Sequence, residues 1–574
     1  MTPLQLRIRT ENELRILFKQ HHEFKRRSYP EWASYDGDHR YDDQLTDLSH
    51  DATAERTRKN RGFLRQLQQL PVHLLSAEEQ RNARLFEQML QQDIDAFQLG
   101  LHFLCIDQQE GMHLKFPQWA EIHPLETYGQ YQQYFSRLKG FSKQVSDTLQ
   151  NLEMGRRRGV MHPRCVVAQS LLQMKTLATQ PCEQMPLYLP ILNHADDLSA
   201  ELAIRVKAVT ARLITEHVQP AYQQLADFVE HDYLPHCPEA VGLCHLKTGE
   251  DLYHYWVERH VQRGMSVQHI HDTGLQEIVH LKERLNEVLK WLDMPYRAEI
   301  PAHWKALRQE LMQNPAYYYT SEEQLLTDYA QMLERAEAAL PDYFSALPRT
   351  SCELRALEPW RAAAAPQAYY YAPPQDLSRP GIYYVNTHAL SERPRYAMMA
   401  LTLHEAVPGH HLQLARALET PRLPDFRYHL ECTAFVEGWA LYAEALGFEM
   451  GLYDELQALG ALGFELWRSS RLVVDTGIHA LGWTREQACN YLRDNTLQSE
   501  TDIQSEVDRY IALPAQALAY KMGERRIRQW RAQAESTLGA DFNLRDFHEV
   551  LLQSGSLPLD ELQRDMSDYL KVAI

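Results

Sequence analysis

The chain has 574 residues, of which 44% are hydrophobic and 24% charged, as is typical of a globular protein with a large core. Its formal net charge of −18 argues against a nucleic-acid binder and against binding to anionic membranes, because both need basic surface. No stretch is apolar enough for a membrane span, and Arg7 and Arg9 interrupt any secretory leader. The eight cysteines are scattered, without a C-x-x-C pair. We therefore expect a cytoplasmic protein with reduced thiols.

Most of the chain predicts α-helix. Leu, Ala, Glu, Gln and Arg dominate, and apolar residues recur three and four positions apart, for example in 197–231, 275–293 and 323–346. Residues 366–386 differ, because aromatic and β-branched clusters alternate there with Pro and Gly. They predict two short strands joined by a turn, and the helical pattern returns from about residue 394. The expected fold class is mainly α, with a small β-hairpin or short sheet.

A soft domain boundary is expected near residue 340. It separates a helical region at 1–340 from a region at 341–574 that holds the candidate chemistry. Nothing like a linker lies between them, so one fused architecture is as well supported as two domains. Within the second region, Ile382–Asn386 is interpreted as an edge strand, because the flanking prolines suit an edge position.

The strongest candidate for chemistry is the run from His404 to His411, which reads His-Glu-Ala-Val-Pro-Gly-His-His. It supplies three imidazoles that can bind zinc and, in Glu405, a carboxylate that can take a proton from metal-bound water. The spacing departs from H-E-x-x-H, since Pro408 stands where the second histidine would be. On a regular helix His410 would point about 120° away from His404, and His411 would lie about 10.5 Å further along.

A break in the helix would remove this difficulty. Pro408 lacks a backbone donor and disfavours regular helix, and Gly409 tolerates unusual dihedral angles. A bulge over 406–409 would absorb two extra residues and turn His410 towards the same ion as His404. The alternative is an ordinary helix–break–helix with surface histidines, and this segment alone does not separate the two.

A third ligand is predicted further along the chain. Residues 433–444 have the pattern of a helix on which Phe435, Trp439 and Tyr442 mark an apolar face, so Glu437 is expected to be at least partly buried. Buried carboxylates are rare unless they are paired or bound to metal. Two histidines and a glutamate with an open fourth position form a known catalytic zinc arrangement. The alternative is a salt bridge between Glu437 and an arginine elsewhere.

These residues carry a resemblance to a known family. The run from His404 to Leu412, followed by Phe435–Glu444, resembles the bacterial DUF885 family, which is usually grouped with gluzincin-type metallopeptidases. Further similarity spans most of the chain, is strongest over 370–530, and includes Ser378–Gly381, Arg471–His479 and Pro514–Lys521. The resemblance implies a large helical, zincin-like architecture and a bound Zn²⁺.

The resemblance also implies an assignment of the ligands. Aligning Gly409 and His410 with the Gly-His of the M3 oligopeptidases makes His410 the second ligand after a two-residue insertion, with His411 as its substitute. The Phe-Val-Glu segment that ends at Glu437 then supplies the third. His404, His410 and Glu437 are the expected metal ligands.

Three residues spaced four apart form a second group of candidates. Arg471, Asp475 and His479 share one stripe of a helix. Asp475 would hydrogen-bond His479, which then suits support of a metal ligand or stabilisation of an oxyanion. Arg471 is a candidate for binding substrate. A structural polar network that links helices is the equally supported alternative.

Other assignments rest on the likeness to gluzincins and zincins. Gluzincins commonly place a tyrosine from a late helix against the tetrahedral intermediate, so Tyr520 is a candidate for stabilising the oxyanion and Lys521 for binding a substrate carboxylate. The alternatives are core packing and a solvated charge. In zincins an edge strand near the metal aligns an extended peptide, so Ile382–Asn386, with Tyr384, is a candidate for binding substrate. A structural hairpin is the equally supported alternative.

The sequence therefore predicts a zinc-dependent peptidase that acts on short peptides. Glu405 would draw a proton from the metal-bound water and pass it to the leaving amine, and Tyr520 or His479 would stabilise the oxyanion. By family analogy, the helical region 1–340 would wall the cleft. The alternatives are a zincin-derived peptide-binding protein without turnover, and a zinc hydrolase of a non-peptide amide or ester. Neither nucleic acid nor membrane is an expected partner.

Overall fold

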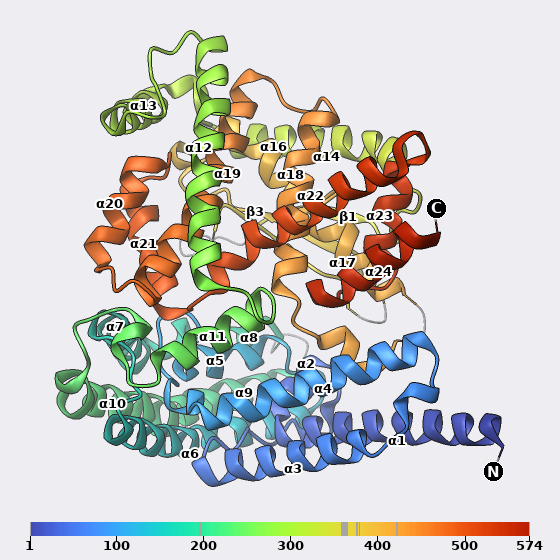
Figure 1. Ribbon diagram of the computed structural model, residues 1–574. Helices are drawn as coiled ribbons and strands as arrows, with labels where there is room; N and C mark the ends of the chain where they lie inside the picture. Colours follow the sequence, from blue (N-terminus) through green and yellow to red (C-terminus); the bar gives the residue numbers. More distant parts are fainter. Residues whose placement is uncertain are drawn as a thin grey trace. The chain divides into compact units, whose positions relative to one another are not determined.

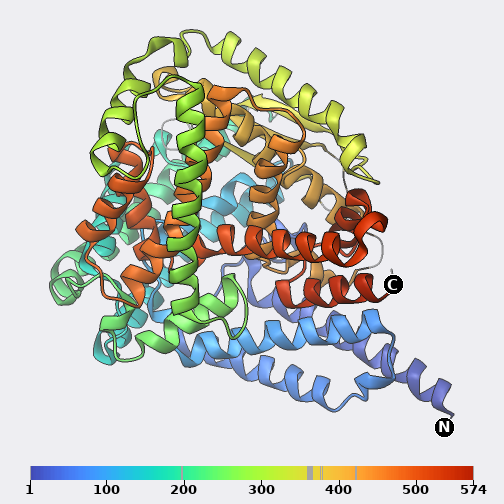
Figure 2. The ribbon, with the colours of Figure 1, turned by 45° about the horizontal axis from the view of Figure 1, so that its top comes forward.

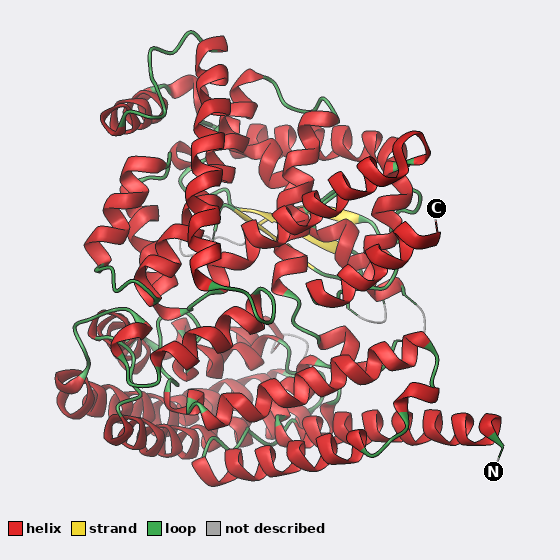
Figure 3. Cartoon of the chain, in the orientation of Figure 1, coloured by secondary structure: helices red, strands yellow, loops and turns green. Residues whose placement is uncertain are grey.

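The computed structural model describes residues 2–194, 198–357, 366–374, 377, 379–420 and 423–572. Among them α-helices predominate around one small three-stranded sheet (Figure 3). The expected fold class, mainly α with a short sheet, is confirmed. Ser378, at the start of one family-like segment, lies outside the described residues. No helix in the described ranges has the length and apolar character needed to cross a membrane.

The chain forms two compact units. Unit 1 runs to Tyr255 and also takes in Pro424–Phe426 and Ile511–Leu513, and unit 2 contains the remainder. The units therefore divide near residue 255, whereas the soft domain boundary expected near residue 340 falls inside unit 2. The physical reason is the packing of the helix at Val267–Trp291, whose leucines share a hydrophobic core with those of the helix at Glu455–His479.

Unit 1 is built from helices. Its α-helices are α1 (Pro3–Ser28), α2 (Pro30–Tyr35), α3 (His50–Gln68), α4 (Ala77–Gln98), α5 (Met112–Gln118), α6 (Tyr128–Arg158), α7 (Arg164–Thr179), α8 (Leu189–His194), α9 (Ala200–Leu213) and α10 (Gln219–Phe228). The long helix α6 lies at the centre of its core, where Phe141 packs on Tyr222 of α10 with ring centroids 4.6 Å apart. Helix α11 (Gly249–His260) begins in unit 1 and ends in unit 2.

Unit 2 contains the sheet and every candidate site residue. Its helices are α12 (Val267–Trp291), α13 (Pro301–Gln313), α14 (Glu322–Tyr343), α16 (Arg395–Glu405), α17 (His410–Glu419), α18 (Thr433–Glu449), α19 (Glu455–His479), α20 (Arg485–Asn495), α21 (Glu500–Ala512), α22 (Ala519–Leu538), α23 (Leu544–Leu552) and α24 (Leu559–Val572). Helix α12 runs alongside α19 (Figure 1 and Figure 2), and α16 and α18 also pack on α19.

The sheet has the strand order β1-β3-β2. Strand β3 (Gly381–Val385) pairs in parallel with β1 (Cys352–Ala356) and antiparallel with β2 (Ala368–Tyr371). The two strands expected within 366–386 are thus present as β2 and β3. The expectation that Ile382–Asn386 forms an edge strand is wrong, because β1, which was not predicted, pairs with the other side of β3.

Helices α18 and α22 cross with their backbones in contact. A Cβ added to Gly438 would lie 2.4 Å from the carbonyl carbon of Gly523, and one added to Gly523 would lie 1.8 Å from the carbonyl oxygen of Ala434. Helix α18 is apolar on nearly all sides and is buried along most of its length. Because Glu437 precedes Gly438 and Tyr520 lies one turn before Gly523, this crossing fixes these two side chains relative to each other.

Replacing Gly523 by Ala should lower the free energy of unfolding by about 3 kcal/mol or more, because the crossing helices must separate to admit a methyl group. Urea denaturation of the variant and the parent protein measures this. Gly62→Ala in α3 is the matched control: nothing lies within 4 Å of its added Cβ, so it should stabilise by up to about 1 kcal/mol. A Gly523→Ala protein as stable as the parent would contradict the close crossing.

Candidate metal centre

A distorted turn connects the two halves of the histidine-rich segment. Helix α16 ends at Glu405, α17 begins at His410, and between them Ala406 (φ −98°, ψ −102°) and Gly409 (φ −73°, ψ −129°) leave the helical region. A Cβ on Gly409 would lie 1.9 Å from the carbonyl oxygen of His404. The turn therefore requires glycine, and it spans the 406–409 stretch where a bulge was expected.

His404, His410 and Glu437 come together at one point. Their ligand atoms all lie within 4.8 Å of one another, and among the described residues they are the one such group of three. Glu437 Oε2 is 3.6 Å from His404 Nε2 and 3.7 Å from His410 Nε2. Donor atoms that share a tetrahedral zinc ion at 2.0–2.2 Å lie about 3.3–3.6 Å apart. The two imidazoles and one carboxylate fit zinc in chemistry, and the distances from the carboxylate to the two imidazoles are close to this spacing.

Glu444 supports this group and was missed in the sequence. It lies two turns after Glu437 on α18, so both carboxylates share one face of the helix. Glu444 Oε1 accepts a hydrogen bond from His404 Nδ1 at 2.7 Å. A carboxylate in this place fixes the tautomer and ring orientation of a metal-binding histidine, which leaves Nε2 for the metal. The available signal was a second acid seven residues after Glu437 on an otherwise apolar helix.

The three ligands differ in the direction of their pKa shifts. Burial acts to lower the pKa of His404, but hydrogen bonds to Glu437 and Glu444 outweigh it and raise the pKa to about 9. Burial acts to raise the pKa of Glu437, but the hydrogen bond from His404 and neighbouring positive charge lower it to about 2. Burial lowers the pKa of His410 to about 4. Without metal, His404 therefore carries a proton while His410 is neutral.

Glu405, the expected general base, is the last residue of α16 and directly follows the candidate ligand His404. Burial raises the pKa of its carboxyl to about 7, although the charge of His404 acts to lower it. Its Oε2 accepts a hydrogen bond from the backbone N–H of Tyr370 in β2 at 2.9 Å. A carboxyl group with a pKa near neutrality can both accept and return a proton at physiological pH.

His411 is not placed to substitute for His410. Its Nε2 donates to the carbonyl oxygen of Thr350 at 3.0 Å, so its Nδ1 accepts from the hydroxyl of Tyr370 at 2.9 Å. Both ring nitrogens are therefore occupied by protein partners, and His411 ties the start of α17 to the sheet.

Tyr384 lies on the wrong face of the sheet for the expected role in binding substrate. Its neighbour Tyr383 reaches Thr402 of α16, with 3.4 Å between their oxygens, and Tyr370, the direct partner of Tyr383 in β2, reaches α17. Side chains alternate along a strand, so Tyr384 points away from these helices. It pairs in register with the exposed Arg355 of β1.

Lys521 is committed to a buried ion cluster rather than to a substrate carboxylate. Its side chain is 1% exposed, and Nζ lies 2.7 Å from Glu465, 2.9 Å from Glu524 and 3.1 Å from Glu277. Three protein carboxylates already surround the ammonium group, so the expected role of Lys521 in binding substrate is wrong.

His479 and Asp475 also serve the structure rather than the reaction. His479 Nε2 donates to the carbonyl oxygen of Tyr510 at 2.9 Å, and burial lowers the pKa of this imidazole to about 4. It is therefore neutral and turned towards the main chain, which contradicts its expected role at an oxyanion. Asp475 accepts from the backbone N–H of Ala515 at 3.1 Å and so holds the turn that leads into α22.

Tyr520 and Arg471 lie together next to the metal ligands. The guanidinium of Arg471 is 4.6 Å from the ring centroid of Tyr520 and 4.4 Å from that of Trp467. Its Nε donates to the Tyr510 hydroxyl at 3.1 Å. Burial, followed by the negative charge of Glu437, raises the pKa of Tyr520, which therefore keeps its hydroxyl proton at neutral pH. Tyr520 thus remains a candidate donor to an oxyanion.

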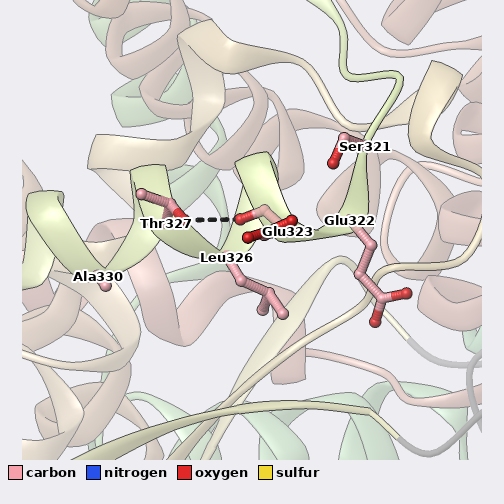
Figure 4. Close-up of a pocket in the computed structure, with 6 residues that line it drawn as sticks. All are labelled: Ser321, Glu322, Glu323, Leu326, Thr327 and Ala330. Carbon is pink, nitrogen blue, oxygen red and sulfur yellow. Dashed lines mark hydrogen bonds between the residues drawn. The ribbon is translucent and has the colours of Figure 1, made fainter.

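A separate hollow lies at the start of α14 and contains none of the candidate residues. It is lined by Ser321, Glu322, Glu323, Leu326, Thr327 and Ala330 (Figure 4). Ser321 accepts from the backbone N–H of Gln324 at 3.3 Å, and Thr327 donates to the carbonyl of Glu323 at 2.8 Å. Capping and the favourable placement of acids at a helix N-terminus account for these side chains.

Comparisons place the chain among known proteins. A family model described as "Bacterial protein of unknown function (DUF885)" matches residues 30–566. A solved structure described as a "putative lipoprotein" from Colwellia psychrerythraea has a TM-score of 0.91 and 25% identity, covering 98% of this chain and 100% of that chain. A second "putative lipoprotein", from Shewanella oneidensis, has a TM-score of 0.75 and 18% identity, covering 96% and 99%. A search among curated proteins found no match.

A third solved structure is described as a "putative oligoendopeptidase F" from Bacillus anthracis. It has a TM-score of 0.32 and 11% identity, covering 91% of this chain and 94% of that chain. A TM-score this low does not show a shared fold, so the zincin-like architecture stays a prediction from the sequence.

The expectation of a cytoplasmic protein is contradicted. Two solved structures that match almost the whole chain are described as lipoproteins, a description that does not suit the cytoplasm. That expectation rests on the charged residues near the first residue of the sequence and on the scattered cysteines, and neither observation identifies a compartment.

Replacing Glu444 by Gln should weaken zinc binding by about 10–100-fold, because a neutral amide holds the imidazole of His404 less firmly and lowers its basicity. Competition with a chromophoric chelator measures the affinity. Glu449→Gln on the same helix removes a carboxylate that pairs with Arg531 and should leave zinc affinity unchanged. Equal affinities of the two variants would show that Glu444 does not support the metal.

Zinc binding should release about one proton per ion between pH 7 and 9, because His404 must lose the proton that its pKa of about 9 retains. The apparent affinity should therefore fall about tenfold for each pH unit below 9 in this range. His410 adds nothing to this release, since its pKa of about 4 leaves it neutral. Isothermal titration calorimetry in buffers of different ionisation enthalpy counts the protons, and a count of zero at pH 8 would rule out a protonated His404.

Proposed function

The chain belongs to the DUF885 family of bacterial proteins, and we propose that it is a zinc-dependent peptidase that hydrolyses short peptides. The observation that carries the proposal is the meeting of His404, His410 and Glu437, from three successive helices, at one point. Glu405 directly follows the first ligand. The likeness of this motif to those of gluzincin-type metallopeptidases supports the same chemistry.

Each residue of the site has a chemical task in this proposal. Zinc in such a donor set supplies Lewis acidity and lowers the pKa of water. Glu405 takes the proton from the attacking water and returns it to the leaving amine, for which a pKa of about 7 is suited. The protonated hydroxyl of Tyr520 donates a hydrogen bond to the oxyanion. Glu444 keeps the ring of His404 in place throughout.

Strand β2 replaces Ile382–Asn386 as the strand that aligns substrate. It lies at the edge of the sheet, and the N–H of Tyr370 is directed at Glu405 rather than at β3. An extended peptide that adds to this edge would form main-chain hydrogen bonds beside the general base. Short peptides are therefore the proposed substrates, since an extended main chain is what an open strand edge recognises.

Glu405→Gln should retain zinc and lose peptide hydrolysis by about 10²–10⁴-fold, because the amide cannot accept the proton of water. The value of kcat/KM for hydrolysis of the peptides in a mixture of short peptides measures this loss. Chelator-treated protein, before and after zinc is added back, serves as the control. The matched pair His410→Ala and His411→Ala tests the ligand set: the first should lose zinc, and the second should keep it.

The outcomes also separate the rival functions. Undiminished hydrolysis by Glu405→Gln would remove this residue from the mechanism. Zinc-loaded protein that binds peptides without cleaving them would be a peptide-binding protein, and cleavage of other amides or esters alone would define a different hydrolase.

A further inference from the structure

Two buried arginines on α19 have hydrogen-bonding capacity that the protein does not use. Arg468 and Arg471 are nearly one turn apart, and their side chains are 7% and 5% exposed. Nε and Nη1 of Arg468 and Nη1 of Arg471 have no hydrogen-bond partner within the described chain. Burying a charged donor without a partner is costly, so three such nitrogens on neighbouring side chains point to a ligand that accepts their hydrogen bonds.

Both arginines contact groups of the metal centre. Arg468 Nη2 lies 3.6 Å from Glu444 Oε1, the oxygen that also accepts the hydrogen bond from His404. Arg471 stacks on Tyr520. Their guanidinium groups lie 5.1 Å and 4.4 Å from the ring of Trp467. The unused N–H groups therefore belong to the same part of unit 2 as the reacting groups.

The charge around Arg471 is unbalanced. Arg471 and Arg509 share one carboxylate, that of Glu506, at 3.2 Å and 2.8 Å. Another N–H of Arg509 donates to the uncharged amide oxygen of Gln516 at 2.6 Å. The charge of Glu437 also interacts with that of Arg471, but in the proposed function Glu437 binds zinc. Two guanidinium groups therefore share one paired carboxylate, and an anionic ligand at the unused nitrogen of Arg471 would supply a second.

We propose that Arg468 and Arg471 form a subsite for the C-terminal carboxylate of the peptide, so that the enzyme is an exopeptidase of the carboxypeptidase type. This inference rests on the proposed function and narrows its substrate class. Guanidinium groups match carboxylates in charge and in the fork of their N–H donors. The part-exposed ring of Trp467 packs on both guanidinium groups, and that of Tyr520 packs on Arg471, so the two arginines are held side by side.

The test compares one short N-acylated peptide with a free C-terminal carboxylate against the same peptide as its C-terminal amide. With the zinc-loaded full chain, kcat/KM should favour the acid by at least tenfold. Arg471→Gln should bring this ratio close to one, and Arg471→Lys should keep part of it. Arg485→Gln is the matched control, because this arginine of unit 2 pairs with Asp508, and it should leave the ratio unchanged. Zinc affinity and thermal unfolding show whether each variant is folded.

The outcomes distinguish a failed subsite from a failed peptidase. Equal hydrolysis of the acid and the amide by the parent protein would overturn the subsite and leave the peptidase intact. If neither peptide is cleaved, the proposed function has failed, and equilibrium binding of the same two peptides decides on the subsite. Tighter binding of the acid that Arg471→Gln abolishes would support it, and equal affinity or no binding would overturn it.

Discussion

The metal centre depends on a turn that only glycine permits. At Gly409 a side-chain carbon would overlap the carbonyl oxygen of His404, the first of the three candidate metal ligands. Without that carbon, α16 can end and α17 can begin within four residues, and two imidazoles that a regular helix would hold apart face the same carboxylate. The local cost of leaving the helix is offset by burial, since the turn and most of the adjoining helices are inaccessible to solvent.

Helix α18 supplies acids that a buried apolar helix would normally exclude. Glu437 and Glu444 are tolerated because each has a cationic or metal-binding partner: Glu437 lies between two histidines, and Glu444 lies between His404 and Arg468. The same low-polarity surroundings move the pKa of Glu405 towards neutrality. Burial therefore surrounds the candidate ligands and also raises the pKa of the neighbouring base. The close crossing of α18 with α22 brings Tyr520 into the same region.

Much of the fold and the grouping of His404, His410 and Glu437 could be predicted from the sequence. Helical periodicity indicated the fold class, and the apolar face around Glu437 indicated a buried acid, because spacing along a helix determines which residues share a face. Periodicity does not show which residues of other helices pack against that face. It could not show that Lys521 meets three carboxylates or that His479 meets a main-chain carbonyl.

The sheet was harder to predict for a related reason. Strand β1 lacks the turn signals that mark β2 and β3, and β2 lies between it and its partner β3 along the chain. Without β1, β3 was taken for an edge, and Tyr384 could not be assigned to a face because the register of the pairing fixes the face. Glu444 and Arg468 were missed because their roles depend on tertiary neighbours.

A crystal structure of the zinc-soaked protein, with anomalous scattering data at the zinc edge, tests the central claim most directly. The account predicts one strong peak with His404 Nε2, His410 Nε2 and a Glu437 carboxylate oxygen within about 2.0–2.2 Å of it. A peak bound by His411, or no peak between α16, α17 and α18, would contradict it.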